Sequence, residues 1–342
     1  MFAKGMAKMQ KKDIGVAHPS ASILLISPQN RILLLQRVNT STSFASAHVF
    51  PGGHVDPQDG ALPPSSDSQC HLDSLPYRLA AIRECFEESG ILLAHQNSNK
   101  TSLINLTDEQ REEGRQIVHA QEIPFKNWLQ QYDAIPDSHN LIPFTRWLTP
   151  TDIRKRFSTQ MYIYFLPLDS PSLVAGAERN KPQHIPTPDG GVEHTAARFL
   201  YAQEWLDLAL HKEIVLFPPQ FVLLSLIAPF LSPPSGSAET SEHEALLEQR
   251  DKLKHWVETD GDPPWGEKCI SPDAIKKVSG RYMIIGLDGP GWELQGTQRR
   301  GDPLRILKVE LDREVEKGKD RPRPVELTWR TDGVREEVKP KL

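Results

Sequence analysis

Short apolar runs alternate with turn-forming residues at the start of the chain. Residues 22–26 and 32–36 are apolar runs separated by Ser27-Pro28-Gln29-Asn30, which predicts two strands joined by a turn. A third strand is predicted to end at Val49-Phe50. It runs into Pro51-Gly52-Gly53, where the chain must turn sharply.

The apolar period then changes from that of strands to that of helices. Residues 60–73 are rich in Pro, Ser and Asp and predict a flexible loop. Ser74 or Asp73 is expected to cap a helix with Pro76 in its first turn and Gly90 at its end.

A second helical region is predicted beyond this helix. Residues 107–110, Thr-Asp-Glu-Gln, have the form of a capping box that opens a helix toward Trp128. The remaining elements are expected as strands at 141–148, 160–168, 282–287, 304–311 and 325–329, and as helices at 203–210, after Pro219 and at 242–257.

These elements predict the domain organisation. We expect a tail at 1–17 and an α/β domain at 18–231, with a loop insertion at 60–75 and a helical insertion at about 107–133. The Pro- and Ser-rich run from residue 232 suggests a linker, which with the charged helix extends to 258. Residues 259–342 are interpreted as a β-rich extension.

Composition and charge narrow the function classes. A net charge of −5 and a pI near 6.2 give no basic surplus for a nucleic-acid backbone, so no nucleic-acid partner is expected. The three cysteines are far apart, which argues against a structural zinc site or a disulfide framework. The uncharged stretch 214–238 is interrupted by Pro218-Pro219 and is too short to span a membrane.

The residues with the clearest chemistry lie in the helix that ends at Gly90. Glu84, Glu87 and Glu88 stand at positions i, i+3 and i+4 and so share one face of that helix. Clustered carboxylates suit a hard divalent cation, Mg²⁺ or Mn²⁺. Arg83 lies four residues before Glu87 and is placed to orient it. The alternative interpretation is a solvated charged face.

Together with the glycine turn, these residues resemble the Nudix box. The first half of that motif is a Gly, five residues and a Glu. After seven further residues comes the second half: Arg-Glu, an aliphatic, any residue, Glu-Glu, any residue, Gly and an aliphatic. Gly53 and Asp59 match the first half, with Asp in place of Glu, and residues 83–91 match the second. Residues 60–82 separate the halves, so the motif carries an insertion, and the role of Asp59 is left open.

A split box of this kind is similar to the peroxisomal-type coenzyme A diphosphatases of the Nudix superfamily. The segments "ILLLQR", "PFTRWLTP" and "EIVLFPPQ" add to the resemblance, which covers about residues 18–231. It implies an α/β/α sandwich with a mixed sheet and helical insertions, to which the strand signals described above add a C-terminal β-rich extension.

The resemblance also implies a set of site residues. Glu84, Glu87 and Glu88 are expected to bind Mg²⁺ or Mn²⁺, with Arg83 orienting them. Glu193, six residues before Phe199, is a candidate base or further ligand, or else an ordinary loop acid. Gly52 and Gly53 are candidate contacts to the substrate, and Arg37 and Arg146 are either phosphate contacts or solvated arginines.

The implied activity is hydrolysis of coenzyme A or an acyl-coenzyme A to 3′,5′-ADP and a 4′-phosphopantetheine derivative. The alternatives are another small substrate (NADH, ADP-ribose, a nucleotide sugar) or an RNA cap, and a non-catalytic Nudix-fold binding module. No protein or membrane partner is indicated. An intracellular location is expected, and Pro340-Lys341-Leu342 differs from a peroxisomal import signal only in its first residue.

Overall fold

A mixed β-sheet forms the centre of the molecule. The computed structural model describes residues 14–38, 46–168, 194–233, 241–277, 282–312 and 321–331. The strand order is β10-β2-β1-β9-β8-β11, with β3 paired to β2 and β4 paired to β1. The bounds are β1 Ala17–Ile26, β2 Ile32–Arg37, β3 His48–Val49, β4 Gly52–His54, β8 Ile142–Leu148, β9 Arg156–Phe165, β10 His194–Leu200 and β11 Cys269–Ile270.

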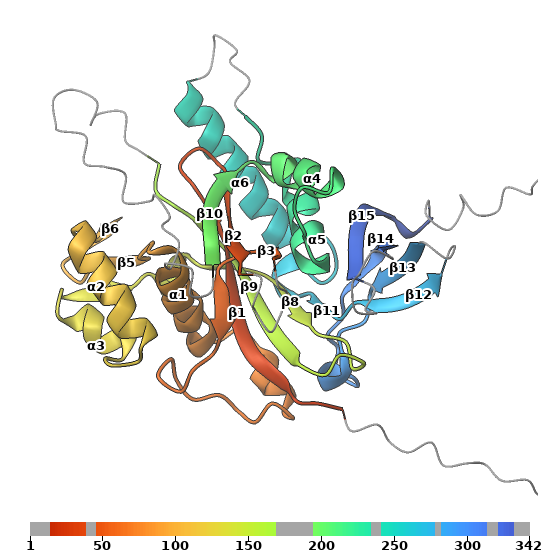
Figure 1. Ribbon diagram of the computed structural model, residues 1–342, viewed down its shortest axis with the longest axis horizontal. Coiled ribbons are helices and arrows are strands. Elements are labelled where there is room, and N and C mark those ends of the chain that lie inside the picture. The colour runs from red at the N-terminus through yellow and green to blue at the C-terminus, as the bar shows by residue number, and fades with distance from the viewer. Residues whose placement is uncertain are drawn as a thin grey trace, which may run out of the picture.

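Helices cover both faces of this sheet (Figure 1). On one face lies α1 (Leu75–Ser89), with α2 (Asp108–His119) and α3 (Phe125–Gln130) beyond it. On the other lie α4 (Ala202–Leu210), α5 (Pro218–Ile227) and α6 (Glu242–Thr259). No helix among the described residues combines the length and apolarity that crossing a membrane requires.

Alternate residues of β1 explain the two layers. Ile23 and Leu25 belong to a core shared with α1, whereas Leu24 and Ile26 belong to a core shared with α4 and α5. Successive strand side chains point to opposite faces, so a nearly continuous apolar strand needs cover on both sides. This arrangement confirms the predicted α/β/α sandwich.

Two smaller sheets flank the sandwich. One, ordered β6-β5-β7, comprises β5 (Ala94–Gln96), β6 (Asn99–Leu103) and β7 (Ala134–Pro136). The other is an antiparallel sheet of β12 (Asp273–Lys277), β13 (Tyr282–Leu287), β14 (Asp302–Asp312) and β15 (Arg321–Trp329). Short 3₁₀ turns occupy Ser68–His71, Ser138–Asn140, Trp265–Glu267 and Trp292–Leu294.

The segment predicted as a flexible loop is packed. It contains the 3₁₀ turn Ser68–His71, in which Cys70 and His71 are fully buried. The Tyr77 hydroxyl donates to the Cys70 carbonyl at 2.6 Å, and His71 Nδ1 lies 2.8 Å from Ser158 Oγ. Its composition is typical of loops, but these long-range contacts order it.

The region expected as a separate extension shares the central core. Strand β11 joins the edge of the main sheet by parallel pairing with β8. Leu253, Trp265 and Leu307 belong to the same apolar cluster as α4 and α5. The boundary expected near residue 232 therefore does not separate two cores, because the C-terminal residues cover the sheet face that α4 and α5 leave open.

Seven of the strands in the described residues were not predicted: β4, β5, β6, β7, β10, β11 and β12. Strand β10 is the edge of the main sheet next to β2, yet His-Thr-Ala-Ala-Arg-Phe-Leu shows little alternation. An edge strand with one pairing partner needs less apolar patterning than a central one, so its sequence signal is weak.

Helix α6 is fastened to the β1–β2 turn by one buried arginine. Arg250 donates from Nε to Asn30 Oδ1, from Nη1 to the Leu166 carbonyl and from Nη2 to the Ser27 carbonyl, each at 2.8 Å. Asn30 has a positive φ of 57°, a conformation that Asn tolerates in turns, and its amide donates to the Leu246 carbonyl. The predicted turn is thus also the docking site of α6.

Replacing Arg250 with Met should destabilise the protein by about 2–4 kcal/mol, because it leaves three buried acceptors without their donor. Urea unfolding followed by circular dichroism measures the loss. Lys252→Met is the matched control, since Lys252 is exposed and pairs with the equally exposed Glu248; it should change stability by less than about 0.5 kcal/mol. Equal effects of the two variants would contradict the anchoring role.

Buried His48 should make stability fall in acid. Burial first, and then the charge of Arg198, lowers its pKa from 6.5 to about 4. The folded state therefore favours neutral imidazole, and the stabilisation present above pH 6.5 is lost as the pH falls toward 4, by up to about 3 kcal/mol. Thermal unfolding at pH 7 and pH 5 should show a smaller acid loss for His48→Gln than for the wild type. Exposed His255→Gln should keep the wild-type loss, and an unchanged loss in His48→Gln would refute the assignment.

Candidate functional site

Helix α1 forms as predicted and carries the three glutamates on the side away from its core residues. It begins after Ser74 with Pro76 in its first turn, and it ends at Gly90, which adopts φ 72°. The Ser74 hydroxyl makes no cap hydrogen bond, contrary to the expectation. Cys85 and Phe86 face the core, where burial raises the Cys85 thiol pKa to about 12, so Cys85 is a core residue.

Arg83 is the centre of the site. Its side chain is 5% exposed and uses all five N–H donors. Nε and Nη2 donate to the two carboxylate oxygens of Asp59 at 3.0 and 2.9 Å, and Nη2 also donates to the His54 carbonyl at 2.9 Å. Nη1 donates to Glu84 Oε1 and Glu87 Oε1, both at 3.0 Å.

The electrostatics of this cluster keep Arg83 charged. Burial alone would lower its pKa, but the hydrogen bond with Asp59 and the charges of Glu84, Asp59 and Glu87 raise the pKa above its ordinary value. A buried guanidinium of this kind holds several carboxylates in fixed orientations. Asp59, whose role the sequence left open, therefore lies in the cluster despite the insertion that follows it.

The two glycines of the turn permit close approach to α1. A side chain at Gly52 would place its Cβ 2.3 Å from the Ala21 carbonyl oxygen, and one at Gly53 would lie 2.5 Å from the Glu84 carboxylate. The freed space lets the Gly52 N–H donate to Glu88 Oε2 at 2.8 Å. Glu84 and Glu88 are thus both fixed against β4.

The end of α1 is electrostatically unusual. Glu87 and Glu88 lie at its C-terminal end, where the helix dipole disfavours negative charge, and α1 has no basic residue in its last turn. Each such placement costs about 0.3–1 kcal/mol. A violated local preference of this kind is expected at functional sites.

The donor chemistry of these glutamates fits a divalent metal. Their side chains are only 15%, 10% and 7% exposed in the order Glu84, Glu87 and Glu88, and carboxylate oxygens are the ligands that Mg²⁺ and Mn²⁺ prefer. Among the described residues, however, no group of three or more His, Cys, Asp or Glu side chains is arranged closely enough to hold a metal ion. One oxygen of each glutamate is engaged by Arg83 or by the Gly52 N–H.

The other predicted residues fall into different places. Arg37 is the register partner of His194 across β2 and β10, and His194 Nε2 lies 3.7 Å from Glu88 Oε1. Arg146 is fully buried. Its Nη1 donates a hydrogen bond to Ser158 Oγ, and its guanidinium lies 4.3 Å from the Tyr77 ring centroid. Its burial does not support the predicted phosphate contact. Glu193 lies outside the described residues.

Three residues near the glutamates were not predicted. His194 lies next to Glu88, as above, and His119 Nδ1 of α2 lies 3.5 Å from Glu87 Oε2. Arg115, also of α2, donates to the Glu87 backbone carbonyl. Arg115 and His119 stand at i and i+4, which indicates a shared helix face, but nothing in the sequence connects that face with α1.

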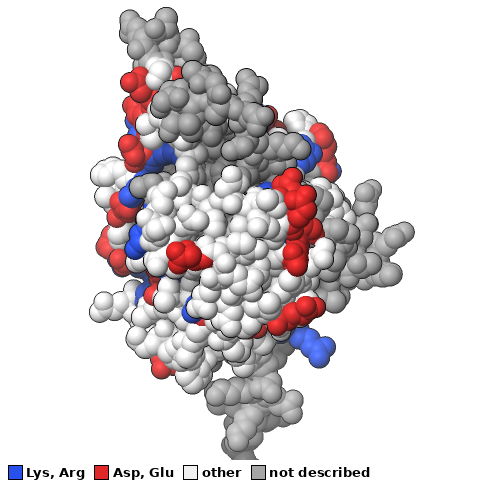
Figure 2. All heavy atoms as spheres, turned by 90° about the vertical axis from the view of Figure 1, so that its left-hand side faces the viewer, with Lys and Arg blue, Asp and Glu red and all other residues white. Residues whose placement is uncertain are grey.

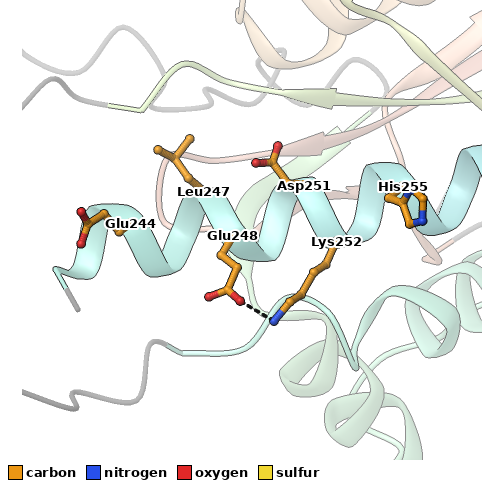
Figure 3. A pocket seen from close by; sticks show the side chains of 6 residues that line it. All are labelled: Glu244, Leu247, Glu248, Asp251, Lys252 and His255. Atoms are coloured by element: carbon orange, nitrogen blue, oxygen red, sulfur yellow. Dashed lines mark ion pairs between the residues drawn. The ribbon is translucent and has the colours of Figure 1, made fainter. Parts of the chain in front are cut away.

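A surface hollow of about 500 Å³ lies elsewhere. Figure 3 shows its lining, all from α6: Glu244, Leu247, Glu248, Asp251, Lys252 and His255. Lys252 pairs with Glu248 at 2.7 Å. None of the predicted site residues lines this hollow.

Replacing Arg83 with Met should destabilise the protein by about 3–5 kcal/mol, because the buried Asp59 carboxylate then loses its cation. The free energy of unfolding in urea tests this. Arg300→Met is the control: Arg300 forms an exposed pair with Asp262, and its loss should cost at most about 1 kcal/mol. A loss of similar size in both variants would exclude Arg83 as the centre of the cluster.

Comparison with known proteins agrees with this geometry. Residues 64–227 match the model of the NUDT19 Nudix domain. The chain is 30% identical over 155 residues to "Putative nudix hydrolase 7" of Caenorhabditis elegans, covering 45% of this chain and 46% of that protein. It is 29% identical over 247 residues to "Acyl-coenzyme A diphosphatase NUDT19" of Gallus gallus, covering 59% of this chain and 62% of that protein.

The matches thus span about half to three fifths of these relatives' lengths. A solved Nudix hydrolase from Alicyclobacillus acidocaldarius aligns over 65% of this chain and 100% of its own, with a TM-score of 0.47 and 18% identity. The chain is thus similar to the NUDT19 Nudix domain over residues 64–227, the part that includes Arg83 and the three glutamates.

Proposed function

We propose that this protein hydrolyses the diphosphate linkage of coenzyme A or an acyl-coenzyme A with the help of Mg²⁺ or Mn²⁺. The observation that carries the proposal is the set Glu84, Glu87 and Glu88, held in place by Arg83 and the Gly52 N–H. The products are 3′,5′-ADP and a 4′-phosphopantetheine derivative.

In this proposal each residue has a defined task. Glu84, Glu87 and Glu88 would hold the metal, which would supply activation of water and compensation of phosphate charge. Arg83 keeps two of these carboxylates oriented, so their geometry is set before substrate arrives. Gly52 and Gly53, the proposed backbone contacts to the substrate, bring main chain rather than side chains against the glutamates. Arg37, beside His194, contacts a phosphate oxygen, and Glu193 acts as base or further ligand.

The substrate class comes from the relatives. The chicken protein, and that of Homo sapiens at 25% identity, are both named acyl-coenzyme A diphosphatase NUDT19. Both matches reach beyond half of this chain, and the split box is common to the resemblance and the structure. This favours a coenzyme A derivative over a dinucleotide.

Other substrates form the principal alternative, because the same cluster can cleave NADH, ADP-ribose, a nucleotide sugar or an RNA cap. Acidic side chains are more prominent than basic ones on the face that carries α2 and α3 (Figure 2), which does not favour a nucleic-acid backbone there. A non-catalytic binding module is the other alternative. The complete set of Arg83 and three glutamates argues against it.

A peroxisomal location accompanies the proposed substrate. Its support is the resemblance to peroxisomal-type enzymes, and residues 340–342, which lie outside the described residues, are the segment to test. Fluorescent tagging at the N-terminus, with and without these three residues, tests the assignment.

Glu87→Gln should lower kcat for acyl-coenzyme A about a hundredfold or more, because it removes one charged oxygen from the metal-binding set. The measurement is chromatographic analysis of 3′,5′-ADP release with Mg²⁺ or Mn²⁺, over a panel of coenzyme A, acyl-coenzyme A, NADH, ADP-ribose and capped RNA. Glu122→Gln, an exposed glutamate after α2, is the control and should keep wild-type rates.

The outcomes separate the alternatives. Release of 3′,5′-ADP that depends on metal and on Glu87 supports the proposal. Cleavage of another panel member would replace the substrate and keep the chemistry. Absence of metal-dependent turnover on the whole panel by the wild type would favour the binding module.

A further inference from the structure

We propose that Arg115 is a positioning residue for the metal-binding glutamates, acting from the inserted helix α2 on the last turn of α1. The proposal rests on the proposed function, and it assigns the α2–α3 insertion a role in the reaction. The insertion contacts both halves of the split motif, as the following observations show.

Arg115 contacts the backbone of two candidate metal ligands. Nε and Nη2 donate to the Glu87 carbonyl at 3.2 and 3.1 Å, and Nη2 also approaches the Glu88 carbonyl at 3.5 Å. The residue is 3% exposed. It therefore satisfies carbonyl groups that the helix end leaves without an intrahelical donor.

The charge of Arg115 also compensates for the composition of α1. Two glutamates stand at the negative end of the helix dipole, and the last turn has no basic residue of its own. Arg83 contacts the side chains of this cluster, whereas Arg115 contacts the backbone that bears them. Without Arg115 the last turn would be free to fray, and Glu87 and Glu88 would shift with it.

Arg115 is itself held firmly. Nη1 pairs with Glu112 one turn earlier at 3.1 Å. A Cβ at neighbouring Gly114 would lie 2.2 Å from the Trp128 ring, so α2 and α3 are in close contact there. Trp128 in turn stacks on Phe86 of α1, with ring centroids 4.8 Å apart. The insertion thus docks beside the residue that immediately precedes Glu87.

The first half of the motif meets the same insertion. The side chain of Gln58, next to Asp59, accepts from the Phe125 N–H at the start of α3 at 2.9 Å. His119, one turn after Arg115, lies 3.5 Å from Glu87 Oε2 with its side chain 45% exposed. The α2–α3 segment therefore contacts both Gln58 and the end of α1. These two parts of the motif are far apart in sequence because residues 60–82 lie between its halves.

The test compares Arg115→Met with Arg115→Lys and with the control Arg111→Met. Arg111 lies one turn earlier on α2 and pairs only with Asp108 among the described contacts. Mn²⁺ binding is measured by electron paramagnetic resonance without substrate, and kcat and KM are then measured with acyl-coenzyme A at saturating metal. Circular dichroism establishes that each variant is folded.

Arg115→Met should weaken Mn²⁺ binding about tenfold or more and lower kcat by a similar factor, with KM little changed. A purely structural role would lower the melting temperature and leave these constants unchanged in the folded protein. Arg115→Lys should lie between Met and wild type, because it keeps the charge and loses the planar fork. Arg111→Met should match the wild type.

The proposal is overturned if folded Arg115→Met keeps the Mn²⁺ affinity and kcat of the wild type. It is also overturned if Arg115→Met and Arg111→Met lose Mn²⁺ affinity and kcat equally. Should Arg115→Met fail to fold, Arg115→Lys decides: weaker Mn²⁺ binding supports the role, and unchanged binding and kcat contradict it. Failure of the proposed function has a different signature, since the wild type would then turn over no panel substrate whatever its Mn²⁺ affinity.

Discussion

The guanidinium of Arg83 joins groups that are distant in sequence and would otherwise repel one another. Asp59, Glu84 and Glu87 are all negative, and all accept hydrogen bonds from this one buried cation. A planar group with five donors is suited to that task, whereas a lysine could not face three carboxylates and a carbonyl together. The arrangement of the candidate site follows from this interaction.

The scaffold around the cluster is built to bring backbone close to α1. Gly52 and Gly53 remove the side chains that would collide with β1 and with Glu84. Alternate residues of β1 bury into two cores, which fixes α1 on one face and α4 and α5 on the other. The glutamates therefore rest on a helix whose opposite side is locked by Cys85 and Phe86.

The additions to the fold contribute to this scaffold in different ways. The C-terminal residues complete the core on the α4 and α5 face, and Arg250 ties α6 to the first turn of the sheet. The α2–α3 insertion reaches the last turn of α1 on the other face. In each addition a buried arginine, Arg250 or Arg115, donates to backbone carbonyls of another segment. Distant segments are therefore joined by charge-assisted hydrogen bonds as well as by apolar contact.

The sequence by itself determined the local features: the strands at the start, helix α1 with Pro76 and Gly90 at its ends, and the common face of Glu84, Glu87 and Glu88. These depend on period, caps and spacing, which are properties of neighbouring residues. Only the tertiary structure decided that Asp59 joins Arg83, that Arg146 is buried, and that Arg115 and His119 reach α1. Such contacts depend on how helices and strands dock, and the energy of docking is spread over residues too far apart for a local pattern to register.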